Sequence, residues 1–294
     1  IRSLMAGKTV ENTEALDVLT YDGDRFITGP TPDDELSHIM SGNDRRAEIY
    51  RRLRDLRDDA AEHVRREFPD IPRRVSGYNL DELLPENGFH VARALVGTEG
   101  TCAVVLEATV RLVPSPPART LVIVGYASID AAGDDVPALL EHGPIGLEGM
   151  GRSLVDNMRA KGLEPDGLKL LPDGNAWLFV EMGGDNEAES RDRARTLVNA
   201  LSQRATSPPV NVVEDRAVAR SAWAAREAGV GVSSRLADGS NTEGGWEDAA
   251  VHPDNLGDYL RAFNDLLDKH GYRSTQYGHF GQGLVHTRID FDLA

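Results

Sequence analysis

Cysteine is almost missing from this chain of 294 residues, in which Cys102 stands alone. A single thiol excludes an internal disulfide, and it excludes an iron–sulfur cluster held by this chain by itself, because such clusters need several cysteine ligands. The scarcity of cysteine suits a reducing compartment. No apolar run approaches the ~20 residues of a membrane-spanning helix. We therefore expect a cytoplasmic location and no membrane span, with peripheral membrane attachment left open.

Positive charge is also scarce. Lys and Arg number 32 against 48 Asp and Glu, which gives a formal net charge of −16. Nucleic-acid binding needs clustered basic residues that neutralise phosphates, so a general nucleic-acid binder is excluded. The apolar content of 40% and the charged content of 27% are ordinary for a globular protein, and the length favours about two domains.

The first part of the chain mixes strand-like and helix-like segments. Residues 15–28 alternate apolar and polar residues around Asp22-Gly23, which is the pattern of a hairpin. Residues 41–68 carry an apolar stripe at helical spacing. Residues 92–117 are interpreted as two strands around a glycine-bracketed turn, followed by a proline-rich boundary.

The second part alternates strands with helices and closes on a hairpin, which predicts an α+β fold with an antiparallel sheet covered by helices on one face. The expected strands are 120–128, 176–184 and one that begins at Trp246, Glu247 and Asp248; the expected helices are 129–142, 152–161, 186–204, 216–228 and 253–270.

Two histidines flank a glycine-bracketed segment in QYGHFGQGLVHTRIDF (276–291). A turn centred on Gln282-Gly283 would make His279 and His286 direct cross-strand partners, with Cβ atoms ~4.5–5.5 Å apart on one face. Two neutral imidazoles at that separation can share a divalent metal or bracket a small anion. The alternative is a pair of ordinary strand histidines, because a metal site usually needs a third protein ligand and none follows in the remaining residues.

A second candidate site is the GTEGT stretch formed by Gly97, Thr98, Glu99, Gly100 and Thr101. Two glycines allow backbone amides to approach a ligand closely, and two threonines add hydroxyl groups. The alternative is a tight connection between strands with no ligand.

Four segments occur in a distinctive order: SGYNLDELL, ALVGTEGTCAVVLEATVRLVP, GWEDAAVHPDNLGDYLRAFNDLLDKHG and YGHFGQGLVHTRIDFDL. This series resembles the FAD-linked oxidases of the vanillyl-alcohol-oxidase (PCMH) type, in the branch of dehydrogenases that act on D-lactate, glycolate or D-2-hydroxyglutarate. The most similar subgroup is fused to an iron–sulfur oxidoreductase. The resemblance covers essentially the whole chain.

The resemblance implies a two-part architecture. Residues 1–118 would be the second half of an FAD-binding domain, and residues 119–294 a substrate (cap) domain. The glycine-rich pyrophosphate loop would precede this chain, so we expect a fragment that is inactive alone and binds FAD weakly or not at all. The residues implied to line the flavin are Ser76, Gly77, Tyr78 and Asn79 together with Gly97, Thr98, Glu99, Gly100 and Thr101.

The resemblance also assigns roles to the histidines. His279 and His286 match paired histidines that bind a divalent metal, such as Zn or Mn, in several members of the family. The third ligand there is a later glutamate that lies beyond this chain. Glu247 is an alternative local ligand. The family usually has Asp and Asn where this chain has Gln282 and Leu284, which leaves the particular substrate open.

Two arginines are candidates for binding a substrate carboxylate. Arg226 matches the arginine that does so in relatives; the alternative is an exposed helix residue that pairs with Glu227 or Asp215. Arg288 follows His286 by two residues and would share its strand face. It would either clamp the substrate or pair with Asp290 or Glu247.

The implied reaction is hydride transfer from the α-carbon of a small 2-hydroxy acid to FAD, with electrons passing to an acceptor or to iron–sulfur centres outside this chain. Two other hypotheses are a non-catalytic binding module that keeps the fold, and a metal-dependent hydrolase that uses His279 and His286.

Overall fold

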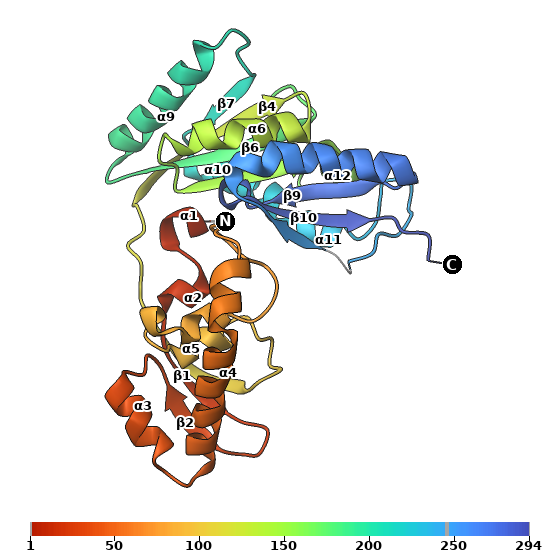
Figure 1. Ribbon diagram of the computed structural model, residues 1–294. Coiled ribbons are helices and arrows are strands. Elements are labelled where there is room, and N and C mark those ends of the chain that lie inside the picture. Colours follow the sequence, from red (N-terminus) through yellow and green to blue (C-terminus); the bar gives the residue numbers. More distant parts are fainter. Residues whose placement is uncertain (1, 245–246, 294) are drawn as a thin grey trace. The chain divides into compact units, whose positions relative to one another are not determined.

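The computed structural model describes residues 2–244 and 247–293. The chain forms two compact units (Figure 1). The large unit comprises Ile1–Ala6, Ile71–Val75 and Ser115–Ala294, and the small unit comprises Gly7–Asp70 and Ser76–Pro114. No helix among the described residues combines the length and the apolar content needed to cross a bilayer.

The small unit contains a three-stranded antiparallel sheet in the order β2-β1-β3, with helices packed on it. Its elements are β1 (Thr13–Leu19), β2 (Arg25–Thr28), β3 (Val104–Val110), α2 (Thr9–Asn12), α3 (Asp33–Met40), α4 (Arg45–Glu67), α5 (Val91–Leu95) and the 3₁₀ turns η1 (Leu80–Leu83) and η2 (Pro85–Asn87). The predicted hairpin is confirmed, since β1 pairs with β2 across a turn in which Gly23 has a φ of 90°.

The long helix begins later than its apolar stripe suggests. Helix α4 begins at Arg45, because the Asp44 carboxylate accepts a hydrogen bond from the Ala47 amide at 2.8 Å and so caps the first turn. It ends at Glu67, shortly before Pro69. Buried Tyr50 anchors it to the core of the small unit.

The first strand expected in residues 92–117 is wrong, because Val91–Leu95 form helix α5. The sequence VARAL contains good helix formers. The imidazole of His90 caps this helix, with its Nδ1 accepting from the Arg93 amide at 3.3 Å. The second expected strand is confirmed as β3, which lies at the edge of the sheet with every residue exposed.

The buried His90 gives the small unit a pH-dependent stability. The pKa of His90 is lowered from 6.5 to about 4, mainly by burial and to a lesser extent by the nearby charge of Arg93. The unfolded chain therefore binds more protons than the folded chain between these two values, so stability falls as the pH drops from about 6.5 towards 4. We expect the urea midpoint of His90→Asn to fall less than that of the wild type between pH 7 and pH 5, because asparagine can cap the helix without titrating. Parallel pH profiles for the two proteins would contradict this prediction.

The large unit is built on a seven-stranded, wholly antiparallel sheet in the order β7-β4-β6-β5-β9-β10-β8. Its strands are β4 (Ala118–Tyr126), β5 (Gly146–Gly151), β6 (Ala176–Gly184), β7 (Val210–Val213), β8 (Asp248–Ala250), β9 (Ser274–Gly278) and β10 (Leu284–Ile289). Its helices are α1 (Ser3–Ala6), α6 (Ile129–Leu140), α7 (Arg152–Lys161), α8 (Pro165–Leu168), α9 (Glu187–Ser202), α10 (Arg216–Glu227), α11 (Gly229–Val232) and α12 (Leu256–His270), with 3₁₀ turns η3 (Pro253–Asn255) and η4 (Phe280–Gln282).

Helices cover both faces of this sheet, so the expectation of one covered face is wrong. Helices α6, α9 and α12 pack on one face through the core that includes Val122, Leu178 and Val180 (Figure 1). Helices α7, α8 and α10 pack on the other through the core that includes Ile123, Trp177 and Phe179. Alternate residues of β4 and β6 supply the two cores, as the period of a strand requires.

Strand β5 was not predicted, because its sequence GLEGMG contains three glycines, which are disfavoured in strands. The structure gives Gly149 a packing reason. A Cβ atom at this position would lie 2.4 Å from the Phe280 ring, so only glycine lets that ring sit on the strand. Phe280 belongs to the turn between the two histidines, so that strand β5 packs against this turn.

Candidate functional site

The two histidines of the last hairpin lie side by side. The ring centroids of His279 and His286 are 5.1 Å apart, and the ring planes meet at 82°. The predicted register is wrong, because His286 pairs with Tyr277 rather than with His279. The turn explains the difference. Strand β9 ends before His279, whose carbonyl accepts from the Leu284 amide across η4. His279 thus leaves the strand, and its ring comes beside His286.

A buried glutamate of β5 holds His279. Glu148 is 1% exposed, and its carboxylate lies 2.9 Å from the His279 Nδ1 and 2.7 Å from an Arg226 Nη. A carboxylate only accepts, so Nδ1 carries the proton and Nε2 keeps its lone pair. Burial is the main cause that lowers the pKa of His279; Glu148 opposes this effect, and Arg226 adds to it. The imidazole is therefore neutral at pH 7.

His286 has a matching arrangement. Its Nδ1 bonds a carboxylate oxygen of Asp248, which lies opposite it on the neighbouring strand β8. The hydrogen bond from His286 is the main cause that lowers the pKa of Asp248. The ring also packs against Tyr277, with centroids 5.0 Å apart. Each imidazole is thus fixed at Nδ1 by its own carboxylate, and neither Nε2 forms a hydrogen bond to another of the described residues.

The two imidazoles resemble the ligands of a divalent metal in one respect. Histidine metal ligands commonly donate their second ring nitrogen to a carboxylate, as both histidines do here. Among residues 2–244 and 247–293, however, no group of three His, Cys, Asp or Glu side chains is placed to hold a metal ion. The two imidazoles therefore supply part of a metal site, and the described chain does not complete it.

Arg226 lies inside the molecule. Its side chain, on α10, is 4% exposed, pairs with Glu148, and stacks over the Tyr277 ring with 5.0 Å between the guanidinium carbon and the ring centroid. The alternative of a surface arginine paired with Glu227 or Asp215 is wrong, because Asp215 instead caps α10 through the amides of its first turn. Arg226 is a buried cation whose charge Glu148 already balances.

Arg288 and Glu247 form an ion pair, with 2.6 Å between the Arg288 Nε and a Glu247 oxygen. This is one of the two pairings expected for Arg288, and Asp290 instead binds Arg273. Glu247 is therefore engaged and does not serve as a third metal ligand among the described residues. Strand β8 begins at Asp248, and Trp246 lies outside the described residues.

The two motifs implied to line a flavin come together in the small unit. The Tyr78 hydroxyl lies 2.7 Å from the Thr101 hydroxyl, and the Asn79 amide donates to the Val96 carbonyl at 2.8 Å. Ser76 and Gly77 are exposed beside them. The loop from Gly97 to Thr101 therefore sits against the segment from Ser76 to Asn79.

This loop fits a ligand with polar oxygen atoms. Gly97, Glu99 and Gly100 have φ values of 82°, 52° and 75°, and a Cβ at either glycine would meet nothing within 4 Å. Within the described part of the chain, the amides of these three residues donate to no acceptor. The hydroxyls of Thr98 and Thr101 both donate to backbone carbonyls, which fixes the shape of the loop.

No role is predicted from the sequence for two residues of the histidine site, Glu148 and Asp248. The available signal for Glu148 is an acid within an otherwise uncharged segment, IGLEGMG, since a carboxylate in buried surroundings must find a partner. For Asp248 the signal is an acidic residue on strand β8, directly opposite His286 on strand β10. This signal can be recognised only once the order of the strands is known.

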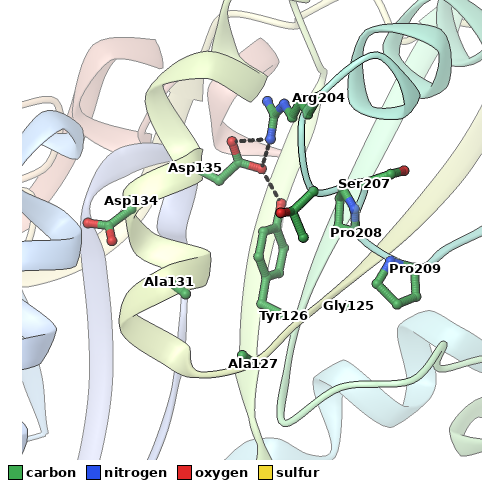
Figure 2. A pocket seen from close by; sticks show the side chains of 11 residues that line it. Gly125, Tyr126, Ala127, Ala131, Asp134, Asp135, Arg204, Ser207, Pro208 and Pro209 are labelled. Atoms are coloured by element: carbon green, nitrogen blue, oxygen red, sulfur yellow. Dashed lines mark hydrogen bonds and ion pairs between the residues drawn. The ribbon is translucent and has the colours of Figure 1, made fainter.

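A cavity of about 460 Å³ lies elsewhere in the large unit, between α6 and the loop before β7 (Figure 2). The Asp135 carboxylate accepts from Arg204 at 2.6 Å and from the Tyr126 hydroxyl at 2.5 Å. Burial and the neighbouring Asp135 raise the pKa of Tyr126, so the phenol stays protonated. Asp135 is balanced by Arg204, and none of the described residues that line this cavity is a histidine.

Comparison with known proteins shows the family to which the chain belongs. The family described as "FAD linked oxidases, C-terminal domain" matches residues 115–294. The structure resembles substrate-bound p-cresol methylhydroxylase with a TM-score of 0.51 at 10% identity, over 96% of this chain and 51% of that one. The fold is thus of the p-cresol methylhydroxylase type. The chain belongs to the FAD-linked oxidase family, whose C-terminal domain it contains, and FAD is the cofactor that this membership implies.

The sequence relatives are longer proteins. D-2-hydroxyglutarate dehydrogenase of Pseudomonas putida is 27% identical over 298 residues, which is 98% of this chain and 29% of that protein. Glycolate oxidase subunit GlcD of Bacillus subtilis is 27% identical over 210 residues, which is 70% of this chain and 42% of that protein. The chain therefore spans less than a third of the first relative and less than half of the second.

Proposed function

We propose that this chain is part of a flavin-dependent dehydrogenase that oxidises a small D-2-hydroxy acid, such as D-lactate, glycolate or D-2-hydroxyglutarate, to the 2-oxo acid. The observation that carries the proposal is the pair of adjacent imidazoles, each fixed at Nδ1 by a carboxylate. Such a pair places the lone pair of the His279 Nε2 where it can accept the hydroxyl proton of a bound acid. The relatives named D-2-hydroxyglutarate dehydrogenase and glycolate oxidase subunit support the substrate class.

The proposed roles follow from the contacts. FAD, when bound, supplies the chemistry that accepts a hydride from the α-carbon. The Nε2 of His279 takes the hydroxyl proton, because Glu148 holds the tautomer with that lone pair available. His286, held by Asp248, lies beside the His279 ring and borders the space that the hydroxyl enters. Arg226 and Arg288 line the site as cations that are each paired with a glutamate.

The remaining assignments are proposals for the whole protein. Residues 1–118 belong to the FAD-binding domain, and Ser76 to Asn79 and Gly97 to Thr101 contact the flavin; residues 119–294 form the substrate domain. Where a carboxylate from outside the described residues completes the site, His279 and His286 would instead hold a Zn or Mn ion, and His279 would then be a metal ligand and not the proton acceptor. Electrons leave through an acceptor or an iron–sulfur module, and the protein is cytoplasmic. By itself, this chain binds FAD weakly and is inactive.

A visible absorption spectrum tests the function. We expect the purified whole protein to show flavin bands near ~450 nm that bleach anaerobically when one of the three acids is added, because the flavin is reduced by the hydride it receives. L-lactate serves as the control of opposite configuration and should reduce the flavin at least about tenfold more slowly. The L enantiomer cannot place its α-hydroxyl at His279 and its α-hydrogen at the flavin at the same time.

The other outcomes are equally informative. Flavin bands that no 2-hydroxy acid bleaches would contradict the proposal and favour a binding module that keeps the fold. A protein without flavin that hydrolyses a substrate only with added metal would favour the hydrolase.

A further inference from the structure

The turn between the two histidines is held by segments that lie far from it in the sequence. Gln282, the last residue of η4, is 5% exposed. Its side-chain oxygen accepts a hydrogen bond from the Ser3 hydroxyl at 2.5 Å and another from an Nη of Arg73 at 3.2 Å. Ser3 belongs to α1, and Arg73 belongs to the segment Ile71–Val75 of the same large unit. One buried amide oxygen therefore joins the turn to two other parts of this unit.

The backbone of this turn in turn holds His279. The His279 carbonyl accepts from the Gln282 amide at 2.8 Å and from the Leu284 amide at 3.2 Å. His279 lies between the end of β9 and the beginning of η4, so it is not part of either strand of the hairpin. The position of its backbone therefore depends on the shape of η4, and the Gln282 side chain fixes that shape from outside the hairpin.

Apolar packing acts at the next residue of the same turn. A Cβ atom at Gly281 would lie 2.6 Å from the Leu4 Cδ1 and 3.0 Å from the Leu147 Cβ, so the turn fits closely between these two side chains. Leu4 follows Ser3 in α1 and packs against the core that lies under α6, α9 and α12. Two adjacent residues of α1 thus hold two adjacent residues of η4, one pair through a hydrogen bond and the other through packing.

We infer that Gln282 is a positioning residue that, with Ser3 and Arg73 as its donors, sets where the Nε2 of His279 meets the substrate hydroxyl. The inference rests on the proposed function, in which His279 accepts the hydroxyl proton. Glu148 fixes the ring at Nδ1, but one hydrogen bond does not prevent the ring from shifting with its backbone. Proton transfer needs about 2.6–3.2 Å between the two heavy atoms, and a displacement of about 1 Å can slow a reaction roughly a hundredfold. The contacts of Gln282 prevent that displacement.

Steady-state kinetics of the FAD-loaded whole protein test the inference, with the 2-hydroxy acid that reduces the flavin fastest as substrate. Gln282→Met keeps the length of the side chain and removes its oxygen. We expect kcat to fall roughly ten- to a hundredfold while KM changes less than about threefold, because a displaced proton acceptor slows the chemical step and the contacts that bind the acid remain. Gln282→Glu keeps an acceptor for Ser3 and Arg73, so it should restore kcat to within about threefold of the wild type.

A second variant tests the same oxygen from its partner. Ser3→Ala should lower kcat roughly three- to tenfold in the wild type, and less than about twofold further in Gln282→Met, because both changes remove the same hydrogen bond. Ser3→Ala removes a half-buried hydroxyl and leaves Gln282 in place, so it gives the comparison with Gln282→Glu even if Gln282→Met does not fold.

A buried glutamine elsewhere in the sheet is the matched control. Gln276 on β9 is 6% exposed, and its side-chain amide donates to Asn264 of α12 at 2.6 Å. Gln276→Met should lower the urea midpoint about as much as Gln282→Met does, since each removes a buried polar contact. It should leave kcat within about threefold of the wild type, because Gln276 does not contact the turn that holds His279. The control thus separates a loss of stability from a loss of positioning.

Three results would overturn the inference and leave the proposed function standing. These are an unchanged kcat in Gln282→Met, a loss of kcat equal to that of Gln276→Met, and an unchanged kcat in Ser3→Ala. A wild-type flavin that none of the acids reduces would overturn the inference and the proposed function together.

Discussion

Glu148→Ala is expected to lower the free energy of unfolding by about 3–5 kcal/mol, the range for breaking one side of a buried ion pair. Glu148 and Arg226 are 1% and 4% exposed, so the truncation leaves a guanidinium buried without its counter-ion. The Arg226 Nε already has no hydrogen-bond partner among the described residues, which makes the loss of the Glu148 contact harder to replace. Urea unfolding of the wild type and the variant measures the difference.

Two controls show whether the cost comes from the buried charge. The double variant Glu148→Met with Arg226→Met should recover most of the lost stability, since well-packed apolar pairs often replace buried ion pairs without a penalty. Glu181→Ala should cost less than Glu148→Ala, because its charged partner Arg2 is 35% exposed and can turn to water, so that only the neutral indole N–H of Trp223 is left buried without its acceptor. A double variant as unstable as Glu148→Ala would point to lost packing rather than to charge.

His279→Asn is expected to lower kcat/KM for the 2-hydroxy acid by about 10²–10⁴, which is the typical contribution of a positioned general base. Asparagine can still hydrogen-bond Glu148 but has no basic nitrogen, so the buried network keeps a partner while the proton acceptor is lost. Steady-state kinetics of the flavin-containing protein measure the effect. His252→Asn is the matched control: His252 is 48% exposed and caps η3, a role that asparagine performs well.

A chelator adds a second comparison to this experiment. Turnover abolished by chelation and restored by Zn or Mn would assign the histidines to a metal completed from outside the described residues. Turnover insensitive to chelation, together with the loss in His279→Asn, would assign His279 directly to the substrate. Activity of His279→Asn within about threefold of the wild type would contradict any catalytic role.

Local patterns in the sequence predicted the periodic elements well. Strand β6 and helix α7 have the predicted bounds, 176–184 and 152–161, because each is a continuous run with strong periodicity or apolar content. The failures occur where local preference is overridden. Strand β5 forms although it is rich in glycine, because it pairs with β6 and β9 on its two sides, and Gly149 makes room there for the Phe280 ring. Residues 92–95 belong to a helix that is capped from His90.

The histidine site shows the limit of reading one segment at a time. A hairpin argument brought His279 and His286 together, and the structure does so through a different turn and a different register. What the hairpin could not reveal is the set of carboxylates behind the imidazoles, since Glu148 and Asp248 come from β5 and β8, on either side of the hairpin. Their roles depend on strand order, which no spacing within 276–291 contains.

The exposed strand β3 has a practical consequence for work with this chain in isolation. It lies at the edge of the small sheet, and Val104, Val105 and Leu106 are each about half exposed along it. An edge of this kind offers a row of backbone groups ready to add a strand from another molecule, and its apolar side chains favour that addition. The isolated chain therefore carries a template for polymerisation, and charged substitutions along β3 are the rational route to a preparation that stays monodisperse at high concentration.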